Sequence, residues 1–201
     1  DVAVLVVSVR ALNMHGGVPK DKVAETNLDA LRSGMANLAK HVENLKKYGL
    51  PVVVAINRFP TADQEEIDMV KDFCRELRVR AAVSEVVAQG GAGGIELAQT
   101  VLDVLNTTET HFRPLYDWNL PIKEKLHRLA TEIYGADGVV YTEQAEKDIQ
   151  SITEMGFAAL PLCVAKTQHS LSDDPTKKGA PRGWHLNVKE VRLSAGAGFL
   201  V

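Results

Sequence analysis

Long apolar runs alternate along the chain with stretches in which apolar residues recur every three or four positions. The first run, Val2–Val9, is nearly continuous and rich in β-branched residues, which predicts a strand buried on both faces of a parallel sheet. The runs Pro51–Ile56 and Ala81–Val87 have the same character and predict two more strands. The first part of the chain is therefore expected to build a parallel sheet.

Amphipathic helices are predicted after each of these strands. Apolar residues recur at helical spacing from Ala24 to Leu45, and Gly49 stands where the C-terminus of that helix is expected. Asp63–Leu77 predicts a second helix with an acidic first turn, and Ile95–Leu105 predicts a third. Because strands and helices alternate, the sequence predicts right-handed crossovers and an α/β fold in which helices flank a mostly parallel sheet.

A smaller α/β subdomain is expected beyond the turn-rich segment "NTTETHFRPLYDWNLP", which gives predicted domains at residues 1–106 and 107–201. For the second domain we expect helices at 122–134 and 143–155, and strands at 138–141, 160–165, 188–193 and 199–201. Both domains are interpreted as parts of a longer protein, because the chain starts and stops inside apolar runs.

Composition argues against several classes of function. A formal net charge of −3 offers no basic surface to nucleic acid, and no apolar stretch is long enough to span a membrane. Cys74 and Cys163 form no paired motif, so a reducing compartment, the cytoplasm, is expected. No two of the six histidines lie close in sequence, and no metal ligand is assigned. Asp173–Asp174 fits either a solvated acidic turn or a hard-cation site, and we favour the turn.

Candidate binding residues lie in the loops that follow the predicted strands, because open parallel sheets bind ligands at the carboxyl ends of their strands. The cleft candidates come from four such loops: Arg10, His15, Gly16 and Gly17; Asn57; Gly90, Gly91, Gly93 and Gly94; Lys166 and Gln168. Glycines let a backbone approach a ligand closely, but the first pair also fits a simple turn and the later four also fit a flexible linker. Arg10 fits a local capping or pairing role equally well.

The aromatic residue Phe59 follows the second predicted strand and is followed by Pro60. Its ring fits two interpretations, packing in the core and stacking against a flat ligand. The sequence contains no Walker-type phosphate loop, no complete G-x-G-x-x-G and no G-x-S-x-G, so neither a phosphate-binding loop nor a hydrolase nucleophile is predicted.

Six blocks of the sequence resemble the formate–tetrahydrofolate ligases and occur in the same order as in that family. Their residues are most similar to those of the single-function bacterial enzymes. They are "VSVRALNMHGG", "VVVAINRFPT", "SEVVAQGGAGGIELA", "IYGADGV", "LPLCVAKTQHSLSDDP" and "SAGAGFLV". Ser8 and Asn13 stand where the family usually has threonine and lysine. The resemblance covers essentially the whole chain, and it implies that the first domain is part of a core similar to that of P-loop NTPases.

The resemblance implies an enzyme that phosphorylates formate with ATP and transfers the formyl group from formyl phosphate to N10 of tetrahydrofolate, releasing ADP and phosphate. It also implies Mg²⁺ with the nucleotide, activation by a monovalent cation, and a homotetramer. The catalytic residues and the phosphate loop of the family are expected upstream of this chain. The chain is therefore interpreted as the C-terminal portion of the enzyme, inactive by itself.

The resemblance further implies that Phe59, Pro60 and Val87 bind folate. In the family, the phenylalanine of N-x-F-P-T stacks on the flat ring of the folate, and a second aromatic residue usually stands where this chain has Val87. Adenine is the alternative ligand, because related P-loop ATPases bind the nucleotide base with the loop that is topologically equivalent to Asn57–Asp63. A stand-alone folate-binding or nucleotide-binding module, and an oligomerisation domain built on the apolar stripe from Ala24 to Leu45, are alternative functions.

Overall fold

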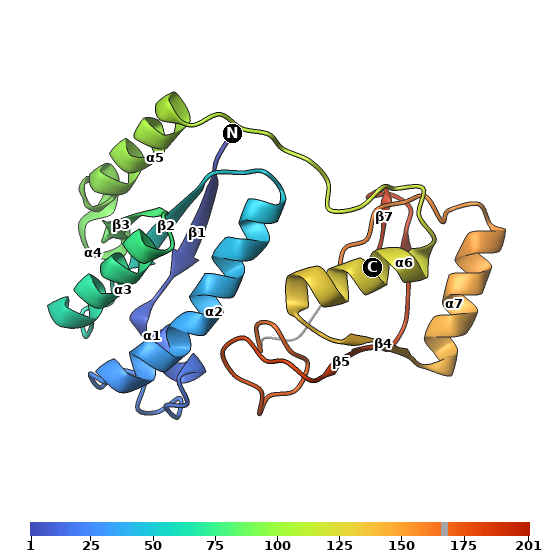
Figure 1. Cartoon of the computed structure of the whole chain (residues 1–201), viewed down its shortest axis with the longest axis horizontal. Coiled ribbons are helices and arrows are strands. Elements are labelled where there is room, and N and C mark those ends of the chain that lie inside the picture. The colour runs from blue at the N-terminus through green and yellow to red at the C-terminus, as the bar shows by residue number, and fades with distance from the viewer. Residues whose placement is uncertain (166–168) are drawn as a thin grey trace. The chain divides into compact units, whose positions relative to one another are not determined.

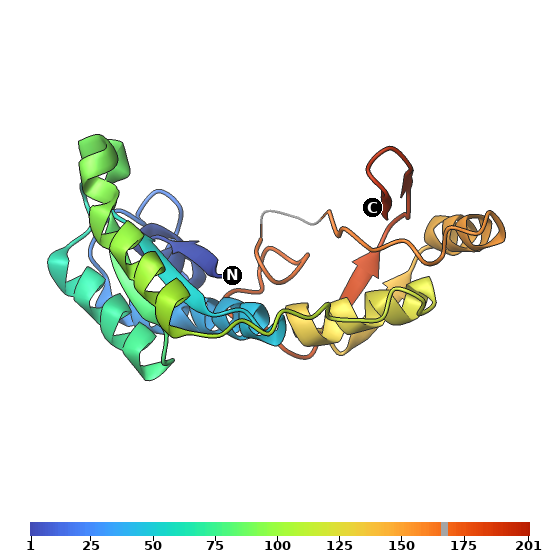
Figure 2. The same ribbon diagram turned by 90° about the horizontal axis from the view of Figure 1, so that it is seen from above.

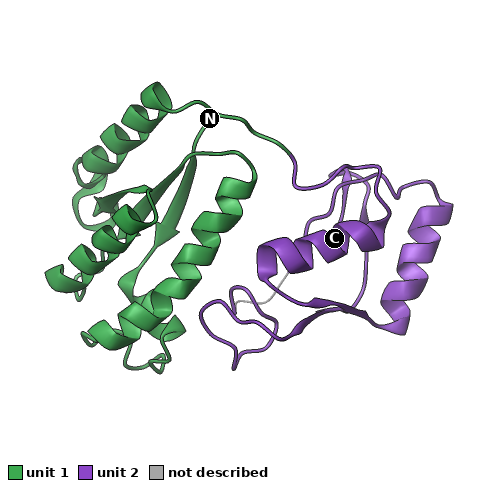
Figure 3. Cartoon of the chain, in the orientation of Figure 1, with its two compact units in different colours: residues 1–113 green, residues 114–201 purple. Residues whose placement is uncertain are grey.

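The computed structural model describes residues 1–165 and 169–201, which divide into two compact units, Asp1–Arg113 and Pro114–Val201 (Figures 1 and 3). The first unit contains a three-stranded sheet, and the second contains two sheets of two strands each. Helices flank the parallel sheet of the first unit, so the predicted α/β class with a mostly parallel sheet is confirmed. None of the helices in the described part of the chain has the length and apolar character needed to cross a bilayer.

The sheet of the first unit has the strand order β1-β2-β3, and both strand pairs are parallel. The strands are β1 (Ala3–Val7), β2 (Val52–Asn57) and β3 (Arg80–Ser84). Val7, Ile56 and Val83 stand in register across the sheet. The carboxyl ends of all three strands therefore lie at one edge, and the loops that follow them start side by side.

The helices of the first unit are α1 (Val9–His15), α2 (Leu28–Lys47), α3 (Gln64–Glu76), α4 (Val86–Gln89) and α5 (Ile95–Thr107), with the 3-10 turn η1 (Gly90–Gly94) between the last two. α2 and α3 pack on the face of β2 that carries Val54 and Ile56. Successive strand residues point to opposite faces, so Val53 faces the other side, where α5 packs on β2 and β3. Figure 2 shows α5 in front of these strands.

The apolar stripe of α2 belongs to the core of the first unit. Its residues Leu31, Met35, Leu38 and Val42 are buried and pack in one cluster with the strands. The stripe is therefore not available as a surface for oligomerisation, which removes the basis for that alternative function. The helix begins at Leu28 because the side chain of Asn27 accepts a hydrogen bond from the Ala30 amide at 2.9 Å and so caps the N-terminus.

β1 is less buried than the sequence predicts. Val4 is 44% exposed and Val6 is 65% exposed, so the prediction of a strand buried on both faces is wrong for this unit. β1 lies at one edge of the described sheet. On the face that carries Val4 and Val6, α5 packs only on β2 and β3. A continuous apolar run does not reveal whether its strand is central or at an edge.

A helix, α1, occupies most of the segment that was interpreted as a loop after the first strand. Ser8 caps it by accepting a hydrogen bond from the Ala11 amide at 3.3 Å. α1 packs on α2 at glycines: a Cβ atom at Gly16 would lie 1.8 Å from the Ala30 carbonyl oxygen. A Cβ atom at Gly34 would lie 1.9 Å from the Leu12 carbonyl oxygen. Both glycines are therefore needed for the two backbones to meet.

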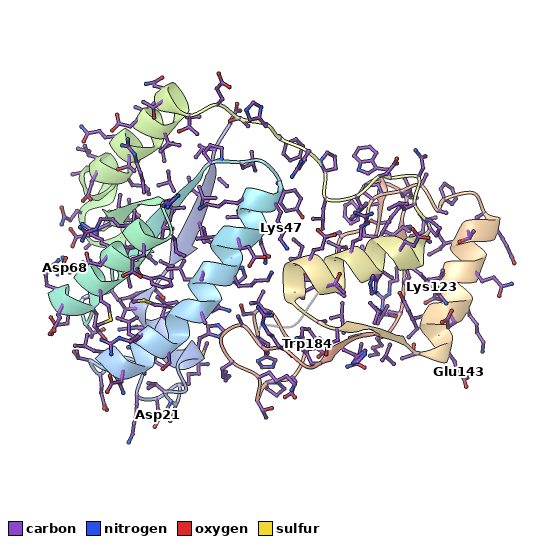
Figure 4. All side chains as sticks on the ribbon, in the orientation of Figure 1. Asp21, Lys47, Asp68, Lys123, Glu143 and Trp184 are labelled. Atoms are coloured by element: carbon purple, nitrogen blue, oxygen red, sulfur yellow. The ribbon has the colours of Figure 1, made fainter. Side chains whose placement is uncertain are left out.

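The second unit contains α6 (Ile122–Arg128), its π-helical continuation η2 (Leu129–Tyr134) and α7 (Glu143–Glu154). The strands β4 (Gly138–Tyr141) and β5 (His185–Val188) pair in parallel, whereas β6 (Leu193–Ser194) and β7 (Phe199–Leu200) pair antiparallel. The strand predicted at 188–193 is therefore two short strands on either side of that range. Lys123 of α6, labelled in Figure 4, donates a 2.8 Å hydrogen bond to Glu146 of α7.

The strand predicted at 160–165 is wrong. In this range, Leu162 forms an isolated bridge to Leu200, and no longer strand is present among the described residues. The fully buried ammonium group of Lys125 donates hydrogen bonds to the carbonyl oxygens of Ala158, at 2.7 Å, and Leu160, at 3.0 Å. A side chain thus binds backbone carbonyl groups at the start of this segment.

Candidate functional site

A contact between Arg10 and Phe59 joins the first two strand-end segments of the first unit. The Cζ atom of Arg10, on α1, lies 4.5 Å from the centroid of the Phe59 ring, which follows β2. The Nη2 atom of Arg10 also donates a hydrogen bond to Thr61 Oγ1 at 2.9 Å. Arg10 therefore contacts residues on both sides of Pro60, and its guanidinium lies over one face of the half-buried ring.

Phe59 also lines an open pocket of about 420 Å³, a volume typical of small-molecule sites. The lining includes two more residues that the sequence singled out, His15 and Asn57. Asn37 and His41 of α2 line the same pocket and were missed. Their spacing of four places them on one face of a helix, which was the available signal, but only the apolar residues of this helix were considered.

The buried carboxylate of Glu66 connects three segments at this edge of the sheet. Its Oε1 atom accepts hydrogen bonds from Asn13 Nδ2 and from the Asn27 amide, both at 3.2 Å, and its Oε2 atom accepts one from the Asp63 amide at 3.3 Å. The residue is only 2% exposed. It therefore anchors α1, the start of α2 and the start of α3 to one another. Glu66 was not among the residues selected from the sequence, although the spacing D-x-x-E at Asp63–Glu66 is that of a capping box.

The third strand-end segment is a compact turn rather than an extended linker. The Glu85 amide donates to the Gly93 carbonyl oxygen at 2.9 Å, and a Cβ atom at Gly93 would lie 2.5 Å from the Glu85 carbonyl oxygen. Gly90 has a φ of +59°, which favours glycine. Gly91 has open space around it, and Gly94 lies close to the side chain of Val86. Close packing thus explains Gly93, and backbone conformation explains Gly90.

An ion pair connects the second segment to this turn. Arg58 Nη1 lies 3.7 Å from Glu85 Oε1, and both side chains are about one-third exposed. Pro60 is exposed and Val87 is 87% exposed, and neither is among the described residues that line the 420 Å³ pocket. Contacts between side chains therefore link all three strand-end segments. The side chains of Pro60 and Val87 are exposed to solvent.

The remaining candidates lie elsewhere. Gly16 and Gly17 line a different open pocket, of about 460 Å³, with the start of α2. Lys166 and Gln168 lie outside the described residues. Among the residues that the structure describes, no three His, Cys, Asp or Glu side chains come together in a way that could hold a metal ion. The structure thus brings His15, Asn57 and Phe59 to one pocket, with Arg10 against the Phe59 ring, whereas Gly16 and Gly17 line a different pocket.

Burial shifts the pKa values of three side chains, none of which is a candidate binding residue. Burial raises the pKa of Cys74, in the core of the first unit, to about 11. Burial, with a smaller contribution from Glu146, raises the pKa of Tyr141 to about 12. Burial also lowers the pKa of Lys125, and the nearby Asp117 partly opposes this effect. These shifts follow from packing and do not by themselves indicate a catalytic group.

The chain was compared with models of known protein families. The family model described as formate–tetrahydrofolate ligase matches residues 1–201, which is the whole chain. The matched residues include those at the strand ends, Arg10, Phe59 and the glycine turn as well as the second unit. The protein therefore belongs to the formate–tetrahydrofolate ligase family.

Proposed function

We propose that the chain is the C-terminal portion of an ATP-dependent ligase that joins formate to tetrahydrofolate. In this reaction formyl phosphate forms from ATP and formate, and its formyl group passes to N10 of tetrahydrofolate, giving 10-formyltetrahydrofolate, ADP and phosphate. The family match along the whole chain supports the ligase chemistry. Homotetrameric assembly and a role in one-carbon metabolism complete the proposal and follow from the family resemblance. A cytoplasmic location is proposed because the two cysteines form no paired motif.

The role that we propose for this chain is to bind and orient the folate. The observation that carries the proposal is the position of Phe59: a half-buried ring at the carboxyl end of a central strand, beside a pocket of small-molecule size. Stacking of the pterin on this ring adds about 1 kcal/mol beyond the burial of area. Pro60 and Val87, both exposed, provide further apolar surface for the same ligand.

Orientation is the contribution that such a site makes to a group transfer. A pterin held flat against a ring fixes the direction of the attached N10 amine, so that amine and acyl donor meet in a productive geometry more often. Mg²⁺, the monovalent cation and the ATP phosphates are assigned to the rest of the enzyme, because the phosphate loop of the family is expected upstream of this chain. The isolated chain, which has no phosphate-loop sequence, is accordingly proposed to be inactive.

The test is Phe59→Ala in the intact enzyme. Loss of stacking and buried area, worth roughly 1 to 3 kcal/mol, should raise the Kd for tetrahydrofolate about 5-fold to 150-fold. The Kd for ATP should not change, because the phosphates are held elsewhere. Phe112→Ala is the matched control, since this ring is 63% exposed and lies at the C-terminal end of the first unit, 53 positions after Phe59 in the sequence.

The same variant separates the folate from the adenine alternative. The carboxyl end of β2 is also where related P-loop ATPases read the base, and this position favours adenine as the second candidate. Weaker ATP binding with unchanged folate binding would assign the ring to adenine. Unchanged binding of both ligands would mean that Phe59 serves only for packing against Arg10.

A further inference from the structure

We propose that Arg10 is a positioning and specificity residue that favours reduced over oxidised pterins through the ring of Phe59. The proposal rests on the proposed function, because it assumes that Phe59 stacks on the folate. Arg10 does not need to touch the ligand for this effect. Its guanidinium lies over one face of the ring, with Cζ 4.5 Å from the centroid.

The cation is held in place from both ends of its side chain. Its head group donates to Thr61 Oγ1 at 2.9 Å, two residues beyond the ring that it covers. Its backbone belongs to α1, which is fixed to α3 by the hydrogen bond from Asn13 to the buried carboxylate of Glu66. The guanidinium is thus positioned before any ligand binds, and binding does not have to order it.

Two consequences follow from this geometry. One face of Phe59 is covered by the guanidinium, so a flat ligand stacks on the other face. The positive charge also draws the π electrons of the ring toward itself, because a cation over an aromatic face interacts with the negative charge of that face. The face that meets the ligand is therefore less negative than in an isolated phenyl ring.

A less negative ring face stacks better on an electron-rich partner. In tetrahydrofolate the saturated pyrazine ring leaves amine lone pairs that donate into the pyrimidine, whereas the fully oxidised pterin is an electron-poor aromatic system. Arg10 therefore strengthens the stacking of the reduced ligand more than that of the oxidised one. Since the reduced cofactor is the formyl acceptor, the contact adds specificity to the site as well as affinity.

The experiment compares two ligands across four forms of the intact enzyme. The Kd values of tetrahydrofolate and of fully oxidised folate are measured by calorimetry for the wild type, Arg10→Met, Arg10→Lys and Arg58→Met. Methionine retains apolar bulk over the ring and removes the charge. Arg58→Met is the matched control, because it removes an equal charge one residue from Phe59, where Arg58 pairs with Glu85 instead.

The wild type should prefer tetrahydrofolate, and Arg10→Met should reduce that preference about 2-fold to 5-fold, the range that corresponds to one exposed cation over a ring. Arg10→Lys should retain part of the preference, and Arg58→Met should retain all of it. Equal weakening of both ligands in Arg10→Met would assign Arg10 a purely structural role and overturn the inference. A loss of preference in Arg58→Met as large as in Arg10→Met would also overturn the inference. The effect would then come from the removal of any nearby positive charge and not from the contact of Arg10 with the ring.

A Phe59→Ala arm distinguishes failure of this inference from failure of the proposed function. If Phe59→Ala weakens folate binding while Arg10→Met leaves the preference intact, the inference is wrong and the folate site stands. If Phe59→Ala changes the Kd of neither tetrahydrofolate nor oxidised folate, the proposed folate site itself is wrong. If Phe59→Ala and Arg10→Met each reduce the preference for tetrahydrofolate over oxidised folate, the folate site and the role of Arg10 are both supported.

Discussion

Replacing Gly34 by alanine tests whether the contact between α1 and α2 determines the stability of the first unit. In an exposed helix this change stabilises a protein by roughly 0.5 to 1 kcal/mol, because glycine loses more backbone entropy on folding. At Gly34 the new Cβ atom would lie 1.9 Å from the Leu12 carbonyl oxygen, and such contacts essentially never occur below 3.0 Å. The atoms that clash belong to the backbone, so no change of side-chain rotamer relieves the contact.

The steric effect should outweigh the entropic one. To reach even the shortest tolerated spacing, α1 and α2 must separate by about 1 Å, and overpacking that requires backbone shifts costs up to about 3 kcal/mol. After subtraction of the gain in helix propensity, the free energy of unfolding should fall by about 2 kcal/mol. Because α1 carries Arg10, the same shift should move the guanidinium away from Phe59 and weaken folate binding.

The assay is urea unfolding of the wild type, Gly34→Ala and the control Ser33→Ala. Ser33 is the exposed neighbour of Gly34 on α2, so its replacement should change stability by no more than about 0.5 kcal/mol. A Gly34→Ala variant that is as stable as the wild type, or more stable, would refute the close backbone contact between the two helices. A destabilised variant with unchanged folate affinity would show that α1 can move without displacing Arg10.

Two further predictions concern buried groups of the first unit. Glu66→Ala should lower the free energy of unfolding by roughly 2 to 3 kcal/mol, because the Asn13 side-chain amide and the Asn27 backbone N–H lose their acceptor. The measurement is urea unfolding at neutral pH, and a loss below about 0.5 kcal/mol would contradict the prediction. In a thiol titration of the native protein at pH 8, the exposed Cys163 should react quickly, whereas Cys74, with a pKa of about 11, should react only after unfolding. Rapid reaction of both thiols before unfolding would count against the buried position of Cys74.

Local patterns in the sequence were sufficient for most of the sheet and its helices. β2 was predicted because five of its six residues, Val52–Ile56, are apolar. All five are buried in the structure, so the pattern and the environment agree. β1 has a similar pattern, yet its outer face is exposed, because the coverage of a face depends on helices far along the chain. α1 was missed because seven residues with several polar side chains give too little periodicity.

The candidate site was predictable residue by residue but not as a set of contacts. Phe59, Asn57 and Arg10 could be selected because they lie at or just after the ends of strands, and strand ends in a parallel sheet share an edge. Glu66 could not be selected in this way, since its partner Asn13 lies 53 positions away in the sequence and neither residue follows a strand directly. Local periodicity contains no information about which distant polar groups will satisfy each other in the interior.

The packing of α1 on α2 connects the fold of the first unit to its candidate chemistry. Glycine at 16 and 34 lets the two helix backbones meet, and this contact fixes the direction in which α1 leaves the end of β1. That direction brings Arg10 over the ring of Phe59, where Thr61 holds the guanidinium. One face of the ring is thereby occupied by a residue of the same unit, and the other face is left for a ligand. Gly16, first interpreted through its closeness to a ligand, thus contributes to the site through the helix that it allows to pack.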